Sequence, residues 1–290
     1  MKRCDVVIVN FNTGQFLTAA VESVLRSRSV AHVYIVDNAS TDGSLDFLPQ
    51  GHDDRLTIIN NTANLGFAGA CNLGLMRTAS ENVLLLNPDC YVMEGAIERL
   101  ITALWSANHV GMVGPLLLTP DLSEQAGGRR KLPMPSLVLA RVIGEARLHR
   151  LLPFRPPYFL QHKDPLPEGP AEVEAISGAC MMVRGEMITD IRPLDEGYFL
   201  HGEDLDWCMR AWRRGWKVLF VPEARVVHHK GVSSQTQPLT VEYYKHVGMV
   251  RFYPQVARPG AAALVPRTIG SWYLDEIRRD SCLPPAFSRN

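Results

Sequence analysis

The chain has 290 residues, 46% of them apolar, so it can bury a large core without disulfides or a structural metal. Its 30 basic and 30 acidic residues cancel, which gives no electrostatic indication of nucleic acid as a partner. The six cysteines form no C-x-x-C pair and most lie in apolar runs, so we expect reduced thiols and a cytoplasmic protein. We predict no signal peptide, and no run approaches the roughly 20 apolar residues of a membrane-spanning helix.

The first part of the chain alternates β-branched runs with helical patterns, which is typical of βαβ units around a mainly parallel sheet. Polar residues directly follow three of the predicted strands, at Asn10, Asp37 and Asp89. Because ligands of open α/β sheets bind at the carboxyl ends of strands, we predict a binding site there. The predicted strands are residues 5–9, 33–36, 56–60, 82–86 and 111–118, and the predicted helices are residues 14–26, 69–79 and 96–107.

Glycine, proline and arginine cluster between residues 127 and 170, which predicts a loop region with one amphipathic helix at 137–152. That helix suits either an anionic lipid surface or ordinary packing on the core. Regular strand and helix patterns begin again at Val173. An acidic segment at residues 195–206 then begins a predicted helix that runs through Trp212. The further predicted strands are residues 173–177, 179–183 and 218–221.

Two carboxylates, Asp37 and Asp89, follow neighbouring predicted strands. Taken alone, Asp37 is better explained as a helix cap or a turn residue, and Asp89 could also be a helix cap. Together they suit a nucleotide and a divalent cation on its diphosphate, Mn²⁺ or Mg²⁺, because such cations take oxygen ligands. His228 or His229 would complete the coordination, and a buried histidine bonded to the backbone is the alternative.

A second acidic pair, Glu203 and Asp204, precedes the helix that runs through Trp212. Carboxylates stabilise a helix N-terminus, so a structural role is one interpretation. The aromatic residues Tyr198 and Phe199 favour another, because an environment that excludes water raises the basicity of a carboxylate. A general base needs that setting.

The glycine-rich run at residues 66–74 lacks the G-x-G-x-x-G spacing, which argues against a dinucleotide-dependent oxidoreductase. Its glycines would instead let a helix approach a donor closely, with Asn64 and Asn72 providing polar contacts. A nucleotidyltransferase is a further alternative, but it would need a basic phosphate loop near the first strand. Residues 10–14 contain no basic side chain.

Seven ordered motifs between residues 5 and 234 resemble the family 2 glycosyltransferases, in particular the bacterial rhamnosyltransferase-like branch. The motifs are VVIVNFN, VDNASTDGS, NLGFAGACNLGL, LLLNPDC, SGACMMVRGE, DEGYFLHGEDLDWCMRAWRRGW and VPEARVVHHKGVSS. The resemblance implies a GT-A fold, in which helices flank a Rossmann-like, mainly parallel sheet. We expect a single domain at residues 1–235, with a nucleotide-binding half at 1–118, an insert at 119–170, a catalytic half at 171–235 and a C-terminal helical extension at 236–290.

The resemblance also implies roles for individual residues. Asn10 and Asn12 would line the nucleobase pocket, and Asp37 would contact the base or the ribose. Asp89 matches the last position of a metal-binding D-x-D element whose first position is Asn87 here, so one expected carboxylate is missing.

In the catalytic half, Asp204 matches the catalytic base of the family and Glu203 its partner. His228 or His229 matches a histidine of the metal shell.

The implied reaction is a single inverting displacement on a nucleotide-sugar donor, with dTDP-rhamnose the first choice and a UDP-hexose the second. The acceptor would be a glycan or a lipid-linked sugar used in cell-surface polysaccharide synthesis. That role implies the cytoplasm, with a peripheral contact to the inner membrane face left open. A catalytically inactive member that binds nucleotide sugars or acts as a scaffold is the alternative of a different class.

Overall fold

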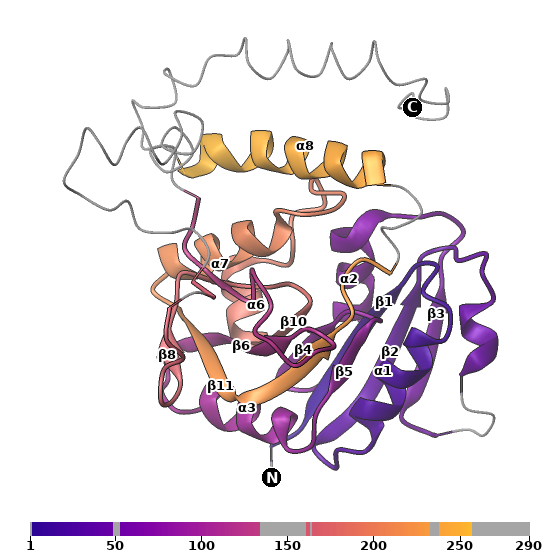
Figure 1. Ribbon diagram of the computed structural model, residues 1–290, viewed down its shortest axis with the longest axis horizontal. Helices are drawn as coiled ribbons and strands as arrows, with labels where there is room; N and C mark the ends of the chain where they lie inside the picture. The colour runs from indigo at the N-terminus through magenta and orange to yellow at the C-terminus, as the bar shows by residue number, and fades with distance from the viewer. Residues whose placement is uncertain (1, 49–52, 134–160, 163, 233–237, 257–290) are drawn as a thin grey trace.

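The computed structural model describes residues 2–48, 53–133, 161–162, 164–232 and 238–256 (Figure 1). A mixed central sheet with helices on both faces forms the body of the protein, as expected. The strand order is β3-β2-β1-β4-β10-β6-β11-β5, with the short β8 (Ala171–Glu172) paired to β11.

The first half of the sheet is parallel, and its strands are β1 (Cys4–Asn10), β2 (Val30–Asp37), β3 (Leu56–Asn60) and β4 (Asn82–Leu86). Every residue of β1 and β4 is buried, as their continuous apolar runs predict for central strands. The register pairs Asn10 with Asp37 and Asp37 with Asn60. The polar residues at these strand ends therefore lie side by side at one edge of the sheet.

The second half of the sheet is mixed because β10 (Cys180–Arg184) lies antiparallel between β4 and β6 (Val110–Leu118). The long strand β11 (Lys217–His228) runs parallel to β6, and its far end pairs with the short antiparallel strand β5 (Cys90–Val92). Because His228 pairs with Cys90, the end of β11 lies next to the turn that follows β4. A separate small ladder joins β7 (Arg129–Arg130) to β9 (Ala175–Ile176).

Two hydrophobic cores cover the two faces of the sheet. One contains α1 (Phe16–Leu25) and α3 (Ala96–Leu104), and the other contains α2 (Gly66–Leu75), α6 (Gly185–Ile191) and α7 (Glu203–Arg213). The alternation of side chains along β1 sends Val6 and Ile8 into the first core and Val7 and Val9 into the second. A short 3₁₀ turn, η1 (Ser44–Phe47), follows β2.

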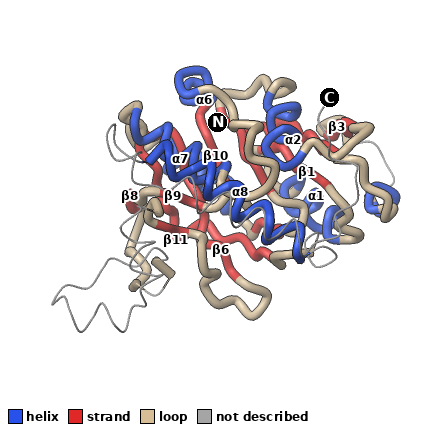
Figure 2. The backbone as a smooth tube through the Cα atoms, turned by 90° about the horizontal axis from the view of Figure 1, so that it is seen from above, coloured by secondary structure: helices blue, strands red, loops and turns tan. Residues whose placement is uncertain are grey.

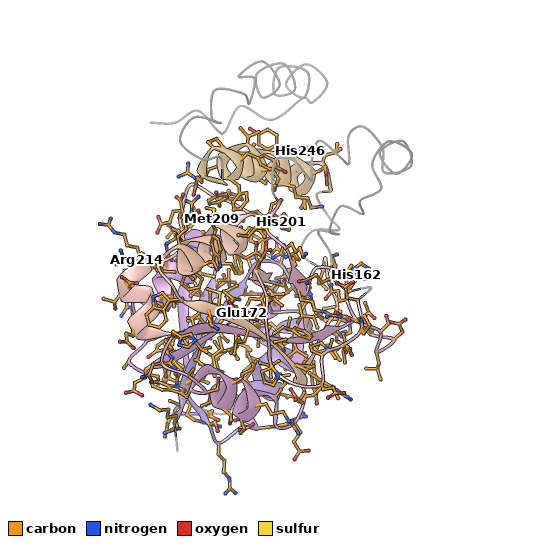
Figure 3. The ribbon with its side chains drawn as sticks, turned by 90° about the vertical axis from the view of Figure 1, so that its left-hand side faces the viewer. His162, Glu172, His201, Met209, Arg214 and His246 are labelled. Atoms are coloured by element: carbon orange, nitrogen blue, oxygen red, sulfur yellow. The ribbon has the colours of Figure 1, made fainter. Side chains whose placement is uncertain are left out.

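The C-terminal helix α8 (Pro238–Val256) lies across α7, as Figures 1 and 2 show, and Phe252 anchors it in the second core. In Figure 3, His201 lies directly beneath α8, which carries His246. The approach is close, since a Cβ atom at Gly248 of α8 would lie 2.3 Å from the carbonyl oxygen of His201. A helical C-terminal extension is thus confirmed as far as residue 256.

The largest difference from the predicted boundaries is in β11, which runs over Lys217–His228 where residues 218–221 were predicted, and the other differences are smaller. Helix α2 begins at Gly66, three residues before the predicted start, because the glycine-rich run hides its apolar spacing. Strand β5 and helix α6 were not predicted, since each is too short to show a clear period. The amphipathic helix expected at 137–152 lies outside the described residues. Within the described ranges, no helix is both long and apolar enough to cross a bilayer.

Candidate active site

The ends of β1 and β2 carry a buried polar network. The side-chain amide of Asn10 donates to Oδ1 of Asp37 at 2.7 Å and to Oγ of Ser44 at 2.7 Å. Oδ2 of Asp37 accepts a hydrogen bond from the backbone N–H of Ser40 at 3.0 Å. Asn12 adopts a left-handed conformation with φ 52°, and its Oδ1 accepts a hydrogen bond from the backbone N–H of Thr41 at 2.8 Å. The structure therefore brings Asn10, Asn12 and Asp37 together.

Asn64 joins this corner through Asn38, a residue that the sequence analysis did not select. Nδ2 of Asn38 donates to Oδ1 of Asn64 at 2.8 Å, and the same oxygen accepts from the backbone N–H of Gly66 at 2.9 Å. Gly66 has φ 77°, and a Cβ atom there would lie 2.5 Å from the carbonyl oxygen of Phe199. The start of α2 thus depends on a glycine that contacts the loop before α7.

Asn72 lies within α2, and its side chain bonds to the segment between α6 and α7. Its amide nitrogen donates to the Leu194 carbonyl at 2.9 Å and to Oε1 of Glu196 at 2.9 Å. Its oxygen accepts from the Leu194 N–H at 3.1 Å. These contacts hold the connection between α6 and α7, so a donor contact by Asn72 remains a prediction with no support from its position.

Asp89 and His228 meet where the turn after β4 lies against the end of β11. Nε2 of His228 is 3.2 Å from Oδ1 of Asp89, and both side chains are more than 90% buried. Oδ1 of Asp89 is buried and has no hydrogen-bond partner among the described residues. A carboxylate oxygen and an imidazole nitrogen that face each other in this way are suitable ligands for a divalent cation.

Cys90 is the third residue whose ligand atom lies within 4.8 Å of the other two. Burial, followed by the charge of Asp89, raises the pKa of the Cys90 thiol well above its usual value. Its Sγ donates to the Ala179 carbonyl at 3.4 Å. Because Mn²⁺ and Mg²⁺ prefer oxygen ligands to thiolates, Cys90 suits such a cation less well than the carboxylate of Asp89 does.

The other predicted residues near this pair have different positions. His229 directs its ring onto Phe16, with ring centroids 4.9 Å apart, and only its backbone N–H reaches Asp89, donating to the carbonyl oxygen at 3.0 Å. Asn87 is half-buried in the turn, where its N–H donates to the Ala179 carbonyl at 2.8 Å. Of the two histidines, His228 is therefore the one whose side chain faces Asp89.

The acidic pair opens α7, and its two members have opposite environments. Burial alone would raise the pKa of Asp204. The charge of Arg130 and hydrogen bonds from the N–H groups of Gly178 and Leu205 have the larger, opposite effect, so the pKa lies below its usual value. Burial, and then the charge of Asp204, raises the pKa of Glu203 to about 8. The two pKa shifts therefore have opposite signs, and they favour an ionised Asp204 beside a protonated Glu203 at neutral pH.

Arg130 forms an ion pair with Asp204 and also donates to the Ile176 carbonyl at 2.9 Å. In the sequence, Arg130 lies in the loop cluster between residues 127 and 170, where we predicted no site residue. The sequence did contain a signal for Arg130. Two arginines follow two glycines there, and an arginine is a natural partner for the several carboxylates of the predicted site. Gln125, which contacts His228, gave no such signal, since an isolated glutamine in a loop has no distinctive pattern.

A single turn, residues 177–179, separates the two ends of the site. The carbonyl of Ala179 accepts hydrogen bonds from Asn87 and Cys90, on either side of Asp89 in the sequence. The N–H of Gly178 donates to Oδ2 of Asp204 at 3.0 Å. The Asp89–His228 pair and the carboxylate of Asp204 therefore lie next to the same turn, although they are far apart in the sequence.

Models of known protein families match most of the chain. The family model described as "Glycosyl transferase family 2" matches residues 5–159, and the one described as "Glycosyl transferase family group 2" matches residues 158–259. An N-acetylglucosaminyl-diphospho-decaprenol L-rhamnosyltransferase of Mycobacterium tuberculosis is 30% identical over 245 residues, which are 80% of this chain and 78% of that one. A low-salt glycan biosynthesis hexosyltransferase of Haloferax volcanii is 26% identical over 232 residues, covering 79% and 67%.

Two solved structures share the fold. GalNAc-T7 with UDP, GalNAc and Mn²⁺ superposes with a TM-score of 0.59 at 18% identity, covering 96% of this chain and 57% of that one. The mannosyltransferase PcManGT from Pyrobaculum calidifontis, in complex with GDP-Man and Mn²⁺, gives 0.54 at 14% identity, covering 96% and 82%. The expected GT-A fold is confirmed by these neighbours.

Proposed function

Because the chain belongs to glycosyl transferase family 2, we propose that it transfers a sugar, with inversion, from a nucleotide-diphosphate donor to an acceptor hydroxyl. The observation that carries this proposal is that Asp204 and the residues on both sides of Asp89 in the sequence contact the same turn, residues 177–179. A displacement with inversion needs the leaving diphosphate and the proton acceptor on opposite faces of the sugar. Two carboxylate sites in this relationship suit those two tasks.

The proposed base is Asp204. Its carboxylate is ionised and is held by Arg130 and Gly178, so it is ready to accept the proton of the attacking hydroxyl. Glu203, which is protonated beside it, adds no second negative charge to the site. The low basicity of Asp204 is compatible with this role if the acceptor hydroxyl loses its proton late, as the bond to the sugar forms.

Asp89 and His228 would hold a divalent cation, and the buried, unpartnered Oδ1 of Asp89 supports that assignment. A cation bound there supplies positive charge beside the diphosphate of the donor. Mn²⁺ is our first candidate because two solved structures with this fold contain it, and Mg²⁺ is the second. At the strand ends, Asn10, Asn12 and Asp37 would bind the nucleoside, with Asn64 and Asn87 close to the same edge.

For the donor we propose dTDP-rhamnose first and a UDP-hexose second, supported by the rhamnosyltransferase name of the 30% identical relative. That name also includes a diphospho-decaprenol carrier, which favours a lipid-linked acceptor over a free glycan. An acceptor of this kind would bring the enzyme to the inner face of the cytoplasmic membrane. The division into a nucleotide-binding half at 1–118 and a catalytic half at 171–235 is part of this proposal.

The test is binding and hydrolysis of a panel of nucleotide sugars with Mn²⁺, Mg²⁺ or EDTA, for the wild type and for Asp89→Ala. We expect one preferred donor, with turnover that EDTA or Asp89→Ala abolishes. Donor binding without turnover under every metal condition would favour the inactive binding protein instead. No binding of any donor would contradict the proposed function.

A further inference from the structure

Gln125 is a buried polar residue with a rigidly placed backbone. Only 5% of its surface is exposed. Its N–H donates to the Leu117 carbonyl near the end of β6 at 2.9 Å, and its own carbonyl accepts from the Gly128 N–H at 3.3 Å. The adjacent Glu124 forms a buried ion pair with Arg129 at 2.8 Å. The side chain of Gln125 therefore starts from a fixed position beside the end of β11.

The side chain of Gln125 forms a hydrogen bond with His228. Oε1 of Gln125 lies 2.9 Å from Nδ1 of the imidazole, and both groups are buried. An amide oxygen only accepts hydrogen bonds, so Nδ1 of His228 carries the proton in this contact. Nε2 is then the ring nitrogen with a free lone pair, and it is the atom that lies 3.2 Å from Asp89.

We propose that Gln125 is a positioning residue that fixes the tautomer and ring orientation of His228 and thereby sets the cation affinity of the Asp89–His228 pair. The inference rests on the proposed function only in that it requires a cation at this pair. Its physical basis is general, because a histidine ligand binds metal through one nitrogen while the hydrogen bond on the other nitrogen decides which one is free. Loss of such a partner typically weakens metal binding by roughly 10–100-fold.

Two variants separate the hydrogen bond from the packing. Gln125→Met keeps a similar length and volume but removes the acceptor oxygen. Gln125→Glu keeps an acceptor oxygen in the same place. Thermal unfolding of both variants shows whether each retains the wild-type fold before any metal is added.

The first measurement is the tautomer of His228 in metal-free protein. Nitrogen-15 spectra of histidine-labelled protein at about pH 8, where imidazole side chains are ordinarily neutral, distinguish a proton on Nδ1 from one on Nε2. The His228 signal is assigned by its absence in His228→Gln. We expect a proton on Nδ1 in the wild type and in Gln125→Glu, and a shift towards Nε2 in Gln125→Met.

The second measurement is Mn²⁺ affinity, followed by the electron paramagnetic resonance signal of free Mn²⁺ and without any donor or turnover. We expect Gln125→Met to bind roughly 10–100-fold more weakly than the wild type, and Gln125→Glu to keep or improve the affinity. A folded Gln125→Met with the wild-type tautomer and affinity would overturn the inference. A wild type that binds no Mn²⁺ would overturn the proposed metal site itself, which is a different result.

Discussion

Arg130 and Asp204 form an ion pair in which only 14% and 13% of the two side chains are exposed. The partners come from β7 and from the first turn of α7, so the pair joins the loop after β6 to the acidic block. The pairing keeps Asp204 ionised in spite of its burial, because the guanidinium charge and the hydrogen bond from Gly178 outweigh the cost of desolvation. We therefore expect Asp204 to act as a base because of where its carboxylate lies, since its pKa is low.

Replacing Arg130 by Met should move the pH dependence of the reaction. Arg130 lowers the pKa of Asp204, so its removal raises that pKa and the base becomes protonated at a higher pH. The acidic limb of the kcat/KM profile should shift upward, while Arg130→Lys should retain part of the effect. An acidic limb that is the same in wild type and Arg130→Met would show that Asp204 is not the group that titrates.

Glu203→Gln should change how stability depends on pH. Burial raises the pKa of Glu203 to about 8 in the folded protein, against 4.5 as its ordinary value. Folding therefore favours the protonated form of Glu203. The resulting contribution to the free energy of unfolding is complete below pH 4.5 and is lost as the pH rises through about 8.

Gln mimics the neutral carboxyl, so urea unfolding of Glu203→Gln should show a smaller loss of stability across that range than the wild type. The exposed Glu94 provides a control, and Glu94→Gln should follow the wild type. Parallel curves for wild type and Glu203→Gln would contradict the assignment of a protonated Glu203.

The two adjacent histidines should differ in metal binding. His228→Ala removes a nitrogen that lies 3.2 Å from Asp89, and we expect Mn²⁺ affinity to fall by at least the roughly 10–100-fold that loss of an outer-shell partner costs. His229→Ala removes a ring that packs on Phe16 and should bind Mn²⁺ as the wild type does. Equal losses in both variants, measured by calorimetric titration, would argue against the side-chain assignment.

Gly66→Ala should destabilise the protein more than Gly215→Ala. Both glycines have a positive φ, but only Gly66 has another residue close to the position that a Cβ atom would occupy. Gly215 has φ 83° with nothing within 4 Å of its Cβ position, so Gly215→Ala should cost about 1–2 kcal/mol for the left-handed conformation alone. At Gly66, a Cβ would also lie 2.5 Å from the Phe199 carbonyl, which adds roughly 1–3 kcal/mol. Chemical denaturation of both variants measures the difference, and equal losses would mean that the Phe199 loop yields easily.

The strand ends were predictable from the sequence because long apolar runs fix where a buried strand stops. Asn10 and Asp37 follow such runs, and the register places them side by side. The contact between Asp89 and His228 depends on β11 continuing to His228 and pairing there with β5, and this long-range pairing has no local sequence pattern.

Arg130 and Gln125 escaped prediction for a related reason. Their contacts with Asp204 and His228 arise only when the loop after β6 is folded against α7 and β11. The two arginines after two glycines gave a weak indication for Arg130, and no sequence pattern indicated Gln125. Asn72 shows the limit of a motif position as evidence, since its hydrogen bonds go to Leu194 and Glu196 and its contact with a donor stays a prediction.

The role of Asp204 as proton acceptor is tested most directly by Asp204→Asn, with donor binding and sugar transfer measured on the same protein preparation. The amide keeps the size of the side chain but cannot take a proton at neutral pH. We expect donor binding at the wild-type level and transfer reduced by about 10²–10⁴-fold, the usual contribution of a general base. Transfer at the wild-type rate would contradict the assignment of Asp204 as the base.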